Sequence, residues 1–234
     1  MGITSSLEDS DRKLLDGKVG VVYGAGGGVG SAVAKAFARE GARVYLAGRN
    51  ESSLSPVAKE TRDKGGIVDI ARVDALDEKS VESHLHEILT KSGRVDISFN
   101  LISSSYAIGT KLTELSDQRS TDAAFNRVRS CFITMTAAGR IMEKQGSGVI
   151  LGLTAPNARL PRPNSGGFAI GEQPSRLSAD SWPWRWGHEE SEWCVLGQVA
   201  HPIILLSGIS SPTSRSSGEY PLKHSPRARP RLPL

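Results

Sequence analysis

A run of glycines that follows a short apolar segment constrains this chain more than any other feature of its sequence. Residues 24–30 read Gly-Ala-Gly-Gly-Gly-Val-Gly. The preceding segment, Val19–Tyr23, predicts a buried strand, and Val29, Val33 and Phe37 recur at helical spacing after the run. Glycine backbone can approach a diphosphate closely, and the free N–H groups at the start of a helix attract its charge. This arrangement predicts a nucleotide-binding turn; a merely flexible turn is the alternative.

The glycines are spaced as G-x-x-x-G-x-G, with Gly24, Gly28 and Gly30 at the three fixed positions. The stricter G-x-G-x-x-G pattern does not fit, because Val29 and Ser31 occupy its two candidate final positions. The run lies directly between a predicted strand and a predicted helix, and this placement favours nucleotide binding over a flexible turn.

Strand and helix patterns alternate along the rest of the first part of the chain. Helices are predicted after Pro56, from Asp77 onward, and over a long segment that carries Phe125 and Met142. Four further strands are predicted at Ala42–Ala47, Ile67–Val73, Val95–Leu101 and Val149–Leu153. Regular alternation of this kind predicts an α/β fold of the Rossmann type, a doubly wound parallel sheet with helices on both faces. On the long helix we expect one apolar face, made of Phe125, Val128, Phe132, Met135 and Met142.

The composition changes near residue 171. Residues 172–234 hold all four tryptophans and eight of the twelve prolines. We therefore expect a flexible N-terminus over residues 1–14, a nucleotide-binding domain over residues 15–171, and an atypical tail over residues 172–234. Disorder and an out-of-frame or alternatively spliced ending are both interpretations of the tail. The sheet is expected to stop after its fifth strand.

Composition also excludes several classes of protein. The net charge of +4, from 29 basic and 25 acidic residues, is too small to indicate nucleic-acid binding by itself. There is no apolar run of transmembrane length and no secretory leader pattern, so we expect no membrane partner and a cytoplasmic location. Cys131 and Cys194 lack the spacing of metal ligands, and His84 and His86 are expected to be surface residues, so no metal site is predicted.

From about Gly17 to Gly171, these motifs together resemble the short-chain dehydrogenase/reductase family. The resemblance implies a Rossmann fold in which Gly24, Gly28 and Gly30 contact a nicotinamide cofactor. The family's glycine motif normally opens with threonine, and here Tyr23 stands in that place.

Two polar residues at the ends of later strands match further cofactor positions of the family. Asp74, after the third strand, matches an aspartate that contacts adenine, although a surface acid in a turn is the alternative. Asn100 matches the first asparagine of an N-N-A-G motif, whose remainder here reads Leu101-Ile102-Ser103.

The end of the second strand bears on the choice of cofactor. Folds that prefer NAD usually place an acid there to bind the ribose 2′-hydroxyl, but this chain has Gly48-Arg49. Arginine can pair with a 2′-phosphate, and glycine removes the repelling carboxylate. We therefore predict NADP(H) in preference to NAD. The alternative is that Arg49 is a solvated residue at the start of a helix.

The proton-transfer residues of the family are replaced in this chain. Phe168 falls at the tyrosine position and Glu172 at the lysine position four residues later, and no Tyr-x-x-x-Lys occurs in the sequence. Ala155 falls at the serine position, so Thr154 is the nearest hydroxyl and our candidate to orient a carbonyl.

The asparagine that the family carries on its long helix has two candidate positions in this chain. Asn126 is the catalytic candidate there, although alignment on Phe132 puts Arg127 in its place.

The resemblance implies an NADP(H)-dependent oxidoreductase that transfers hydride between the cofactor and a small carbonyl or alcohol substrate. Because the proton donor is missing, we expect low activity from this chain. A non-catalytic nucleotide-binding or scaffold protein is one alternative, and an incomplete product without stable function is another. The family also implies a homo-oligomer through the helix around Phe125–Met142.

Overall fold

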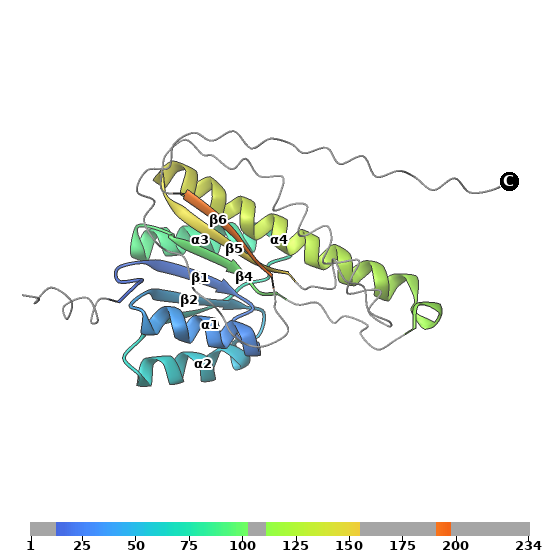
Figure 1. The fold of residues 1–234 in the computed structure, drawn as a ribbon, viewed down its shortest axis with the longest axis horizontal. Helices are drawn as coiled ribbons and strands as arrows, with labels where there is room; N and C mark the ends of the chain where they lie inside the picture. The colour runs from blue at the N-terminus through green and yellow to red at the C-terminus, as the bar shows by residue number, and fades with distance from the viewer. Residues whose placement is uncertain (1–12, 103–110, 155–190, 198–234) are drawn as a thin grey trace, which may run out of the picture. The chain divides into compact units, whose positions relative to one another are not determined.

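The computed structural model describes residues 13–102, 111–154 and 191–197 of the 234-residue chain. All of them lie in the first of the two units into which the chain divides, residues 1–201 and 202–234. The elements, drawn in Figure 1, are β1 (Val19–Tyr23), α1 (Gly28–Arg39), β2 (Arg43–Gly48), α2 (Glu51–Asp63), β3 (Ile67–Arg72), α3 (Glu78–Ser92), β4 (Ile97–Asn100), the 3-10 turn η1 (Leu112–Glu114), α4 (Asp117–Gln145), β5 (Gly148–Thr154) and β6 (Ser191–Gly197).

The strands form one parallel sheet in the order β3-β2-β1-β4-β5-β6. This order confirms the predicted doubly wound α/β fold. Helices α1 and α2 cover one face of the sheet, where Phe37 and Leu54 pack with Val22 and Val44. Helices α3 and α4 cover the other face, where Leu85 packs in a cluster with residues of β1.

Strand β1 lies at the centre of this double core. All five of its residues are buried. Val19, Val21 and Tyr23 belong to the cluster on the α3/α4 face, whereas Val22 belongs to the cluster on the α1/α2 face. This period of two, with apolar residues on both sides, is the pattern of a fully covered parallel strand.

The expectation that the sheet stops after its fifth strand is wrong. Ser191–Gly197 forms β6, which pairs with all of β5, from Gly148 opposite Ser191 to Thr154 opposite Gly197. The run Trp-Cys-Val-Leu within β6 is rich in strand-forming residues, and the unpaired backbone edge of β5 offers it a partner. This strand was not predicted because it is short and lies among residues of unusual composition, within the segment that we expected to be an atypical tail.

The apolar face predicted for the long helix is also partly wrong. Met135 and Met142 are buried against the sheet, as expected, but Phe125 and Phe132 have 72% and 60% of their surface exposed. The buried positions of α4 instead include Cys131 and Ala138. Helical spacing alone cannot place a large aromatic residue on the inner face when small residues also fit there.

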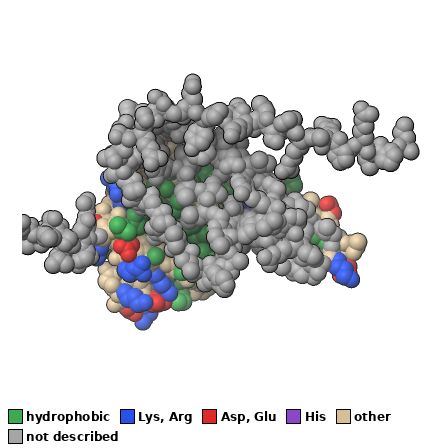
Figure 2. All heavy atoms as spheres, viewed as in Figure 1, with side chains coloured by type: hydrophobic (Ala, Val, Ile, Leu, Met, Phe, Trp, Pro, Cys, Tyr) green, Lys and Arg blue, Asp and Glu red, His purple; other side chains and the backbone are tan. Residues whose placement is uncertain are grey.

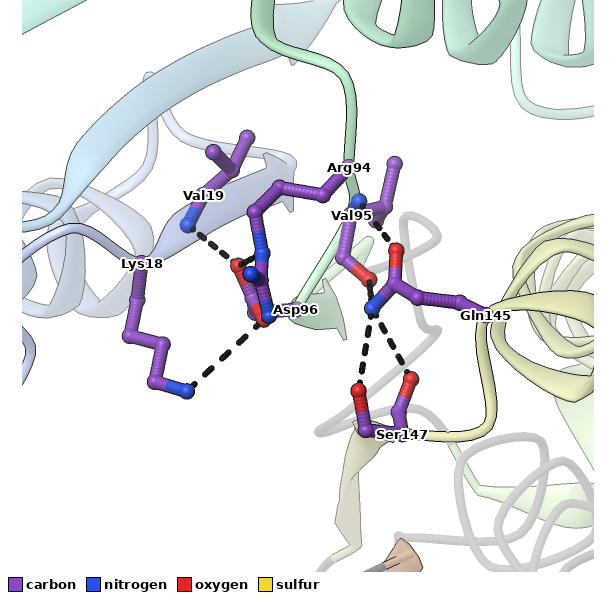
Figure 3. A network of polar contacts seen from close by, with 7 residues as sticks. All are labelled: Lys18, Val19, Arg94, Val95, Asp96, Gln145 and Ser147. Atoms are coloured by element: carbon purple, nitrogen blue, oxygen red, sulfur yellow. Dashed lines mark hydrogen bonds and ion pairs between the residues drawn. The ribbon is translucent and has the colours of Figure 1, made fainter.

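A polar network fastens the amino ends of β1 and β4 (Figure 3). The carboxylate of Asp96, which is 5% exposed, accepts hydrogen bonds from the backbone N–H of Val19 at 2.9 Å and from Nε of Arg94 at 2.8 Å. The ammonium group of Lys18 lies 3.9 Å from the same carboxylate. A buried charge held in this way fixes the register of the two strands, and it lies at the edge of the sheet opposite to the glycine-rich turn.

The same end of the sheet is joined to the end of α4 through Gln145. Its amide oxygen accepts a hydrogen bond from Val95 N–H at 3.1 Å, and its amide nitrogen donates to the carbonyl oxygens of Val95 at 3.2 Å and Ser147 at 3.0 Å (Figure 3). The side chain therefore satisfies backbone groups in two places, just before β4 and in the α4–β5 turn.

Charged side chains gather over the part of the molecule formed by α1 and α2 (Figure 2). There Glu60 pairs with Lys35 of α1 and, at 3.0 Å, with Lys64 of its own helix. Lys59 and Asp63 form a further pair at 3.2 Å. These exposed pairs contribute little to stability.

His84 is buried, contrary to the expectation that it lies on the surface. It is 5% exposed on the inner side of α3, and its ring meets that of Tyr45 edge to face with 6.1 Å between the ring centroids. Neither ring nitrogen has a hydrogen-bond partner among the described residues. Burial lowers the pKa of His84 to about 4; the charge of Glu87 opposes this shift, and the smaller effect of Lys91 adds to it.

This depressed pKa predicts a specific loss of stability in mild acid. Unfolded histidine titrates near pH 6.5, so between about pH 6.5 and 4 the unfolded chain binds more protons than the folded one, and the free energy of unfolding falls as the pH is lowered. We expect a fall of about 2–3 kcal/mol from this residue. Denaturant titrations at pH 7.5 and 4.5 measure it.

The variant His84→Leu should lose this part of the pH dependence, whereas His86→Gln, on the exposed side of the same helix, should keep it. Equal pH dependence of the parent and His84→Leu would contradict the assignment.

Candidate functional site

The carboxyl ends of β1 and β4 lie where the strand order reverses. Strands β2 and β3 extend to one side of β1, and β4, β5 and β6 extend to the other. In an open α/β sheet, ligands bind in the crevice outside the strand ends at such a point. The two loops that leave it begin side by side, because Leu101 N–H donates to the carbonyl oxygen of Tyr23 at 3.0 Å.

Two of the predicted glycines are required by the turn itself. Gly24 has φ of +79°, and a Cβ atom there would lie 2.9 Å from the carbonyl oxygen of Leu101. A Cβ atom on Gly30 would overlap the carbonyl oxygen of Gly24 and lie 2.8 Å from the Cα atom of Ala25. Only glycine allows the start of α1 to pack this closely on the end of β1.

Gly28 differs from both, because its outer side is open. A Cβ atom there would meet nothing within 4 Å. Gly28 is the first residue of α1, Gly27 makes no side-chain cap, and no acid occupies the first turn. The N–H groups of a helix's first turn have no partner within the helix, so they are available to an anion. The turn thus presents an uncovered positive helix end at the place where the sequence predicts a diphosphate.

A pocket of about 460 Å³ lies at the carboxyl ends of β2 and β3, lined by Arg49, Asn50, Arg72 and Asp74. The structure therefore brings together Arg49 and Asp74, two of the residues predicted to bind a cofactor, and adds two that the sequence analysis missed. Asn50 precedes α2, and its side chain does not cap the helix. Arg72 is the last residue of β3.

Asp74 lies on the turn after β3 and is exposed. Its Oδ1 accepts a hydrogen bond from Leu76 N–H at 3.0 Å, and its carbonyl oxygen accepts one from Asp77 N–H at 3.1 Å. The side chain thus helps to form the turn before α3 while it lines the pocket. Its contact with adenine stays a prediction.

The amide of Asn100 is engaged within the protein. The side chain is 2% exposed, its Nδ2 donates to the hydroxyl of Thr134 at 2.8 Å, and its Oδ1 accepts from Ile102 N–H at 3.0 Å. It ties the end of β4 to α4 and shapes the loop that follows. A role towards a cofactor would therefore be exerted through the backbone that Asn100 holds.

Arg127, rather than Asn126, reaches the carboxyl edge of the sheet from α4. Asn126 is exposed, whereas Arg127 is 4% exposed. The guanidinium of Arg127 donates to the carbonyl oxygens of Ile102, at 2.8 Å, and Leu153. It thereby connects the loop after β4 to the end of β5, where Thr154 is the last residue. The catalytic roles of Asn126 and Thr154 stay predictions.

Tyr23, next to the glycine turn, is sealed inside the protein. It is 1% exposed, and its hydroxyl has no hydrogen-bond partner among the described residues. Burial raises the pKa of the phenol above its usual value. This tyrosine therefore stays protonated and has no access to a substrate, so it does not replace the missing family tyrosine.

Phe168 and Glu172 lie outside the described residues. Within the described ranges, no group of three or more His, Cys, Asp or Glu side chains could hold a metal ion. None of the helices in the described part of the chain combines the length and the apolar character needed to cross a membrane.

A family model described as enoyl-(acyl carrier protein) reductase matches residues 24–169 of the chain. Among curated proteins, the 7alpha-hydroxysteroid dehydrogenase of Clostridium sardiniense is 31% identical over 153 residues, which cover 64% of this chain and 57% of that protein. The protein of the same name from Escherichia coli K12 is 30% identical over 161 residues, which cover 69% of this chain and 62% of that protein. The chain thus spans about three fifths of the length of these relatives.

Solved structures support the same fold. An NAD+-bound xylitol dehydrogenase superimposes with a TM-score of 0.68 at 24% identity, covering 72% of this chain and 65% of that one. A metagenomic short-chain oxidoreductase in complex with NADP superimposes with a TM-score of 0.66 at 22% identity, covering 71% of this chain and 75% of that one. One of these proteins holds NAD and the other NADP, so the fold alone does not choose between the cofactors.

Proposed function

Because the chain belongs to the short-chain dehydrogenase/reductase family, we propose that it is an oxidoreductase-type protein that binds NADP(H) at the carboxyl edge of its sheet. The observation that supports the choice of NADP(H) most is the pocket at the end of β2. Gly48 provides no carboxylate there, and Arg49 lines the pocket without a protein partner among the described residues. A 2′-phosphate needs such a cation, whereas a 2′-hydroxyl needs an acceptor.

The residues present fit a dinucleotide at each of its three polar parts. The open backbone at Gly28 and the first turn of α1 would hold the diphosphate. Arg49 would hold the 2′-phosphate, and Asp74 would face the adenine. Gly24 and Gly30 would act indirectly: the absence of a Cβ atom at each allows the tight turn that places the first residues of α1 beside the diphosphate.

We propose that hydride-transfer activity is low. A bound nicotinamide cofactor would supply hydride-transfer chemistry, towards a carbonyl carbon or from an alcohol carbon. The reacting oxygen also needs a proton donor within hydrogen-bonding distance, and the loss of a positioned donor costs about 10²–10⁴-fold in rate. Phe168 has no hydroxyl, and Tyr23 is inaccessible. Thr154 can orient a carbonyl through a hydrogen bond, but a threonine hydroxyl is a poor acid near neutral pH.

Titration and turnover together test this proposal. We expect NADPH fluorescence to change saturably on addition of the protein, and oxidation of NADPH with a panel of small aldehydes and ketones to be slow. No binding of either NADPH or NADP+ would overturn the proposal. Binding without any oxidation above the buffer rate would favour the alternative, a non-catalytic nucleotide-binding protein. A non-cooperative thermal melt with strong binding of a hydrophobic dye would favour an incomplete product.

A homo-oligomer through α4 is a further proposal. Phe125 and Phe132 lie seven residues apart, and thus on one side of the helix, and both are largely exposed. Burial of two such rings against a second copy would remove a large apolar area from water. The cytoplasmic location and the small carbonyl or alcohol substrate stay predictions.

The double variant Phe125→Ser and Phe132→Ser should lower the molar mass in solution to that of a single chain. Light scattering after size-exclusion chromatography measures this. Ile67→Ser is a matched control, because Ile67 is another exposed apolar residue, with 54% of its surface accessible, but lies on β3 and not on α4. An unchanged mass in the double variant, or an equal loss in the control, would contradict an interface on α4.

A further inference from the structure

Two arginines line the pocket at the ends of β2 and β3, and only one of them has a role so far. Arg49 is the residue proposed above to hold a 2′-phosphate. Arg72 lies in the same pocket, on the neighbouring strand, and is exposed. Asn50 and Asp74 complete the lining.

These two arginines share a property that sets them apart. Among the arginines whose side chains the structure describes, Arg49 and Arg72 are the two that neither donate a hydrogen bond nor form an ion pair with the protein. The others all have partners within the described part of the chain: Glu40 for Arg39, Asp69 for Arg43, the carbonyl of Val68 for Arg62, Asp96 for Arg94, backbone carbonyls for Arg127 and Arg129, and Glu82 for Arg140.

The sheet itself holds Arg72 beside Arg49. In the parallel pairing of β2 and β3, Arg72 is the register partner of Gly48. The next peptide is fixed as well, because Val73 N–H donates to the carbonyl oxygen of Gly48 at 3.0 Å. Arg49 follows Gly48 directly, so the two arginines lie at adjacent strand ends. The backbones of these ends cannot separate without breaking the hydrogen bonds between β2 and β3.

The carboxylate in the pocket does not neutralise this pair. Asp74 is engaged by Leu76 N–H, and no ion pair joins it to either arginine among the described residues. Two guanidinium groups against one carboxylate leave the lining net positive. A dianionic ligand group would compensate the arginines and supply several acceptors for their planar sets of donors.

We infer that Arg72 is a second ligand of the 2′-phosphate and forms with Arg49 a two-arginine clamp. This inference rests on the proposed binding of NADP(H), and it adds a residue outside the glycine turn and the β2 terminus. The clamp recognises the adenosine 2′,5′-bisphosphate half of the cofactor without help from the nicotinamide. An adenosine that carries only the 5′-phosphate lacks the group that both arginines contact.

Isothermal titration of the full chain with 2′,5′-ADP and with 5′-AMP tests the clamp. The parent should bind 2′,5′-ADP about a hundredfold more tightly than 5′-AMP, as expected for several charge-assisted hydrogen bonds. Arg72→Ala should weaken 2′,5′-ADP by about tenfold or more and leave 5′-AMP within about twofold. Arg72→Lys should fall between, because an ammonium group keeps the charge but not the two-point geometry.

The outcomes separate the clamp from the choice of cofactor. If Arg49→Ala loses affinity for 2′,5′-ADP but Arg72→Ala does not, the clamp is overturned while NADP(H) binding stands. If Arg72→Ala weakens both ligands equally, Arg72 contacts the adenosine and not the 2′-phosphate, which also overturns the clamp. A parent that binds both ligands equally overturns the clamp and the NADP(H) assignment together.

Arg39→Ala is the matched control for the loss of one positive charge. Arg39 is an exposed arginine on α1 whose partner is its neighbour Glu40, so its removal should change neither affinity. The thermal melt of each variant shows whether the fold persists.

Discussion

Replacement of Arg49 by glutamate should weaken NADPH binding by about a hundredfold or more and leave NADH binding equal or stronger. The substitution removes the charge-assisted hydrogen bonds to the 2′-phosphate and places a carboxylate where it repels that group. The same carboxylate can accept a hydrogen bond from the 2′-hydroxyl of NADH. Fluorescence titration with both cofactors measures the two dissociation constants directly.

The charge reversal Arg39→Glu controls for the change in net charge, because Arg39 is exposed on α1 and pairs with Glu40. It should leave both dissociation constants within about twofold, since exposed charges beyond a Debye length of about 8 Å are largely screened. If Arg49→Glu binds NADPH as tightly as the parent, the assignment of NADP(H) is wrong.

Alanine at Gly30 and alanine at Gly28 should have opposite consequences, although the two positions are only two residues apart. At Gly30 the new methyl group would overlap backbone atoms of Gly24 and Ala25, which cannot rotate away as a side chain could. We expect the free energy of unfolding to fall by about 2–3 kcal/mol. At Gly28 nothing lies within 4 Å, so the fold should be unaffected or slightly stabilised.

Binding should show the complementary result. The Gly28 methyl group projects into the open space beside the first turn of α1, where the diphosphate is proposed to lie, so Gly28→Ala should weaken NADPH by about tenfold or more. Denaturant melts and NADPH titrations of both variants measure the contrast. A Gly28→Ala variant with unchanged affinity would argue against the diphosphate site, whatever the melt of Gly30→Ala shows.

The order of strands and helices could be predicted because local signals agree with one another over the first 154 residues. The run Val19–Tyr23 has the same bounds in the structure as in the prediction, and the other four predicted strands differ by one or two residues at their ends. Most strands are apolar, Asp77 caps α3 as predicted, and the glycine turn joins the first strand to the first helix. The start predicted for the second helix is wrong, because α2 begins at Glu51 and carries Pro56 inside it. Strands of a parallel α/β sheet are easy to recognise in a sequence, because those buried on both faces appear as short apolar runs.

Features that depend on the neighbouring element were not predicted. The edge-to-face contact of His84 with Tyr45 on β2 is one of them. The burial of His84 itself could have been predicted, because it shares the helical spacing of Val81, Leu85 and Ile88, which are buried on the same face of α3. The exposure of Phe132 follows from how α4 lies on the sheet. Strand β6 depends on the free edge of β5, and its own segment is short and set among residues of unusual composition.

Some residues of the candidate site could likewise be predicted from local sequence, whereas others depend on neighbouring elements. Arg49 and Asp74 were found because they directly follow predicted strands, and the structure places both in one pocket. Arg72 was missed because one exposed charge at the end of a strand gives no periodic signal. The register of β2 against β3, had it been worked out, would have placed Arg72 opposite Gly48. The link from Arg127 to the ends of two strands needed the packed helix.

The polar network around Asp96 lies at the opposite end of the strands from the proposed cofactor residues. Because of this distance, stability and cofactor preference, which mutations usually change together, depend on different residues here. A laboratory selection for heat resistance could work on the Asp96 end and leave ligand preference as it was. A selection for another cofactor could rebuild the ends of β2 and β3 and leave the melting temperature nearly constant. The thermal stability of this protein and its preference for one nucleotide over another can therefore be changed one at a time.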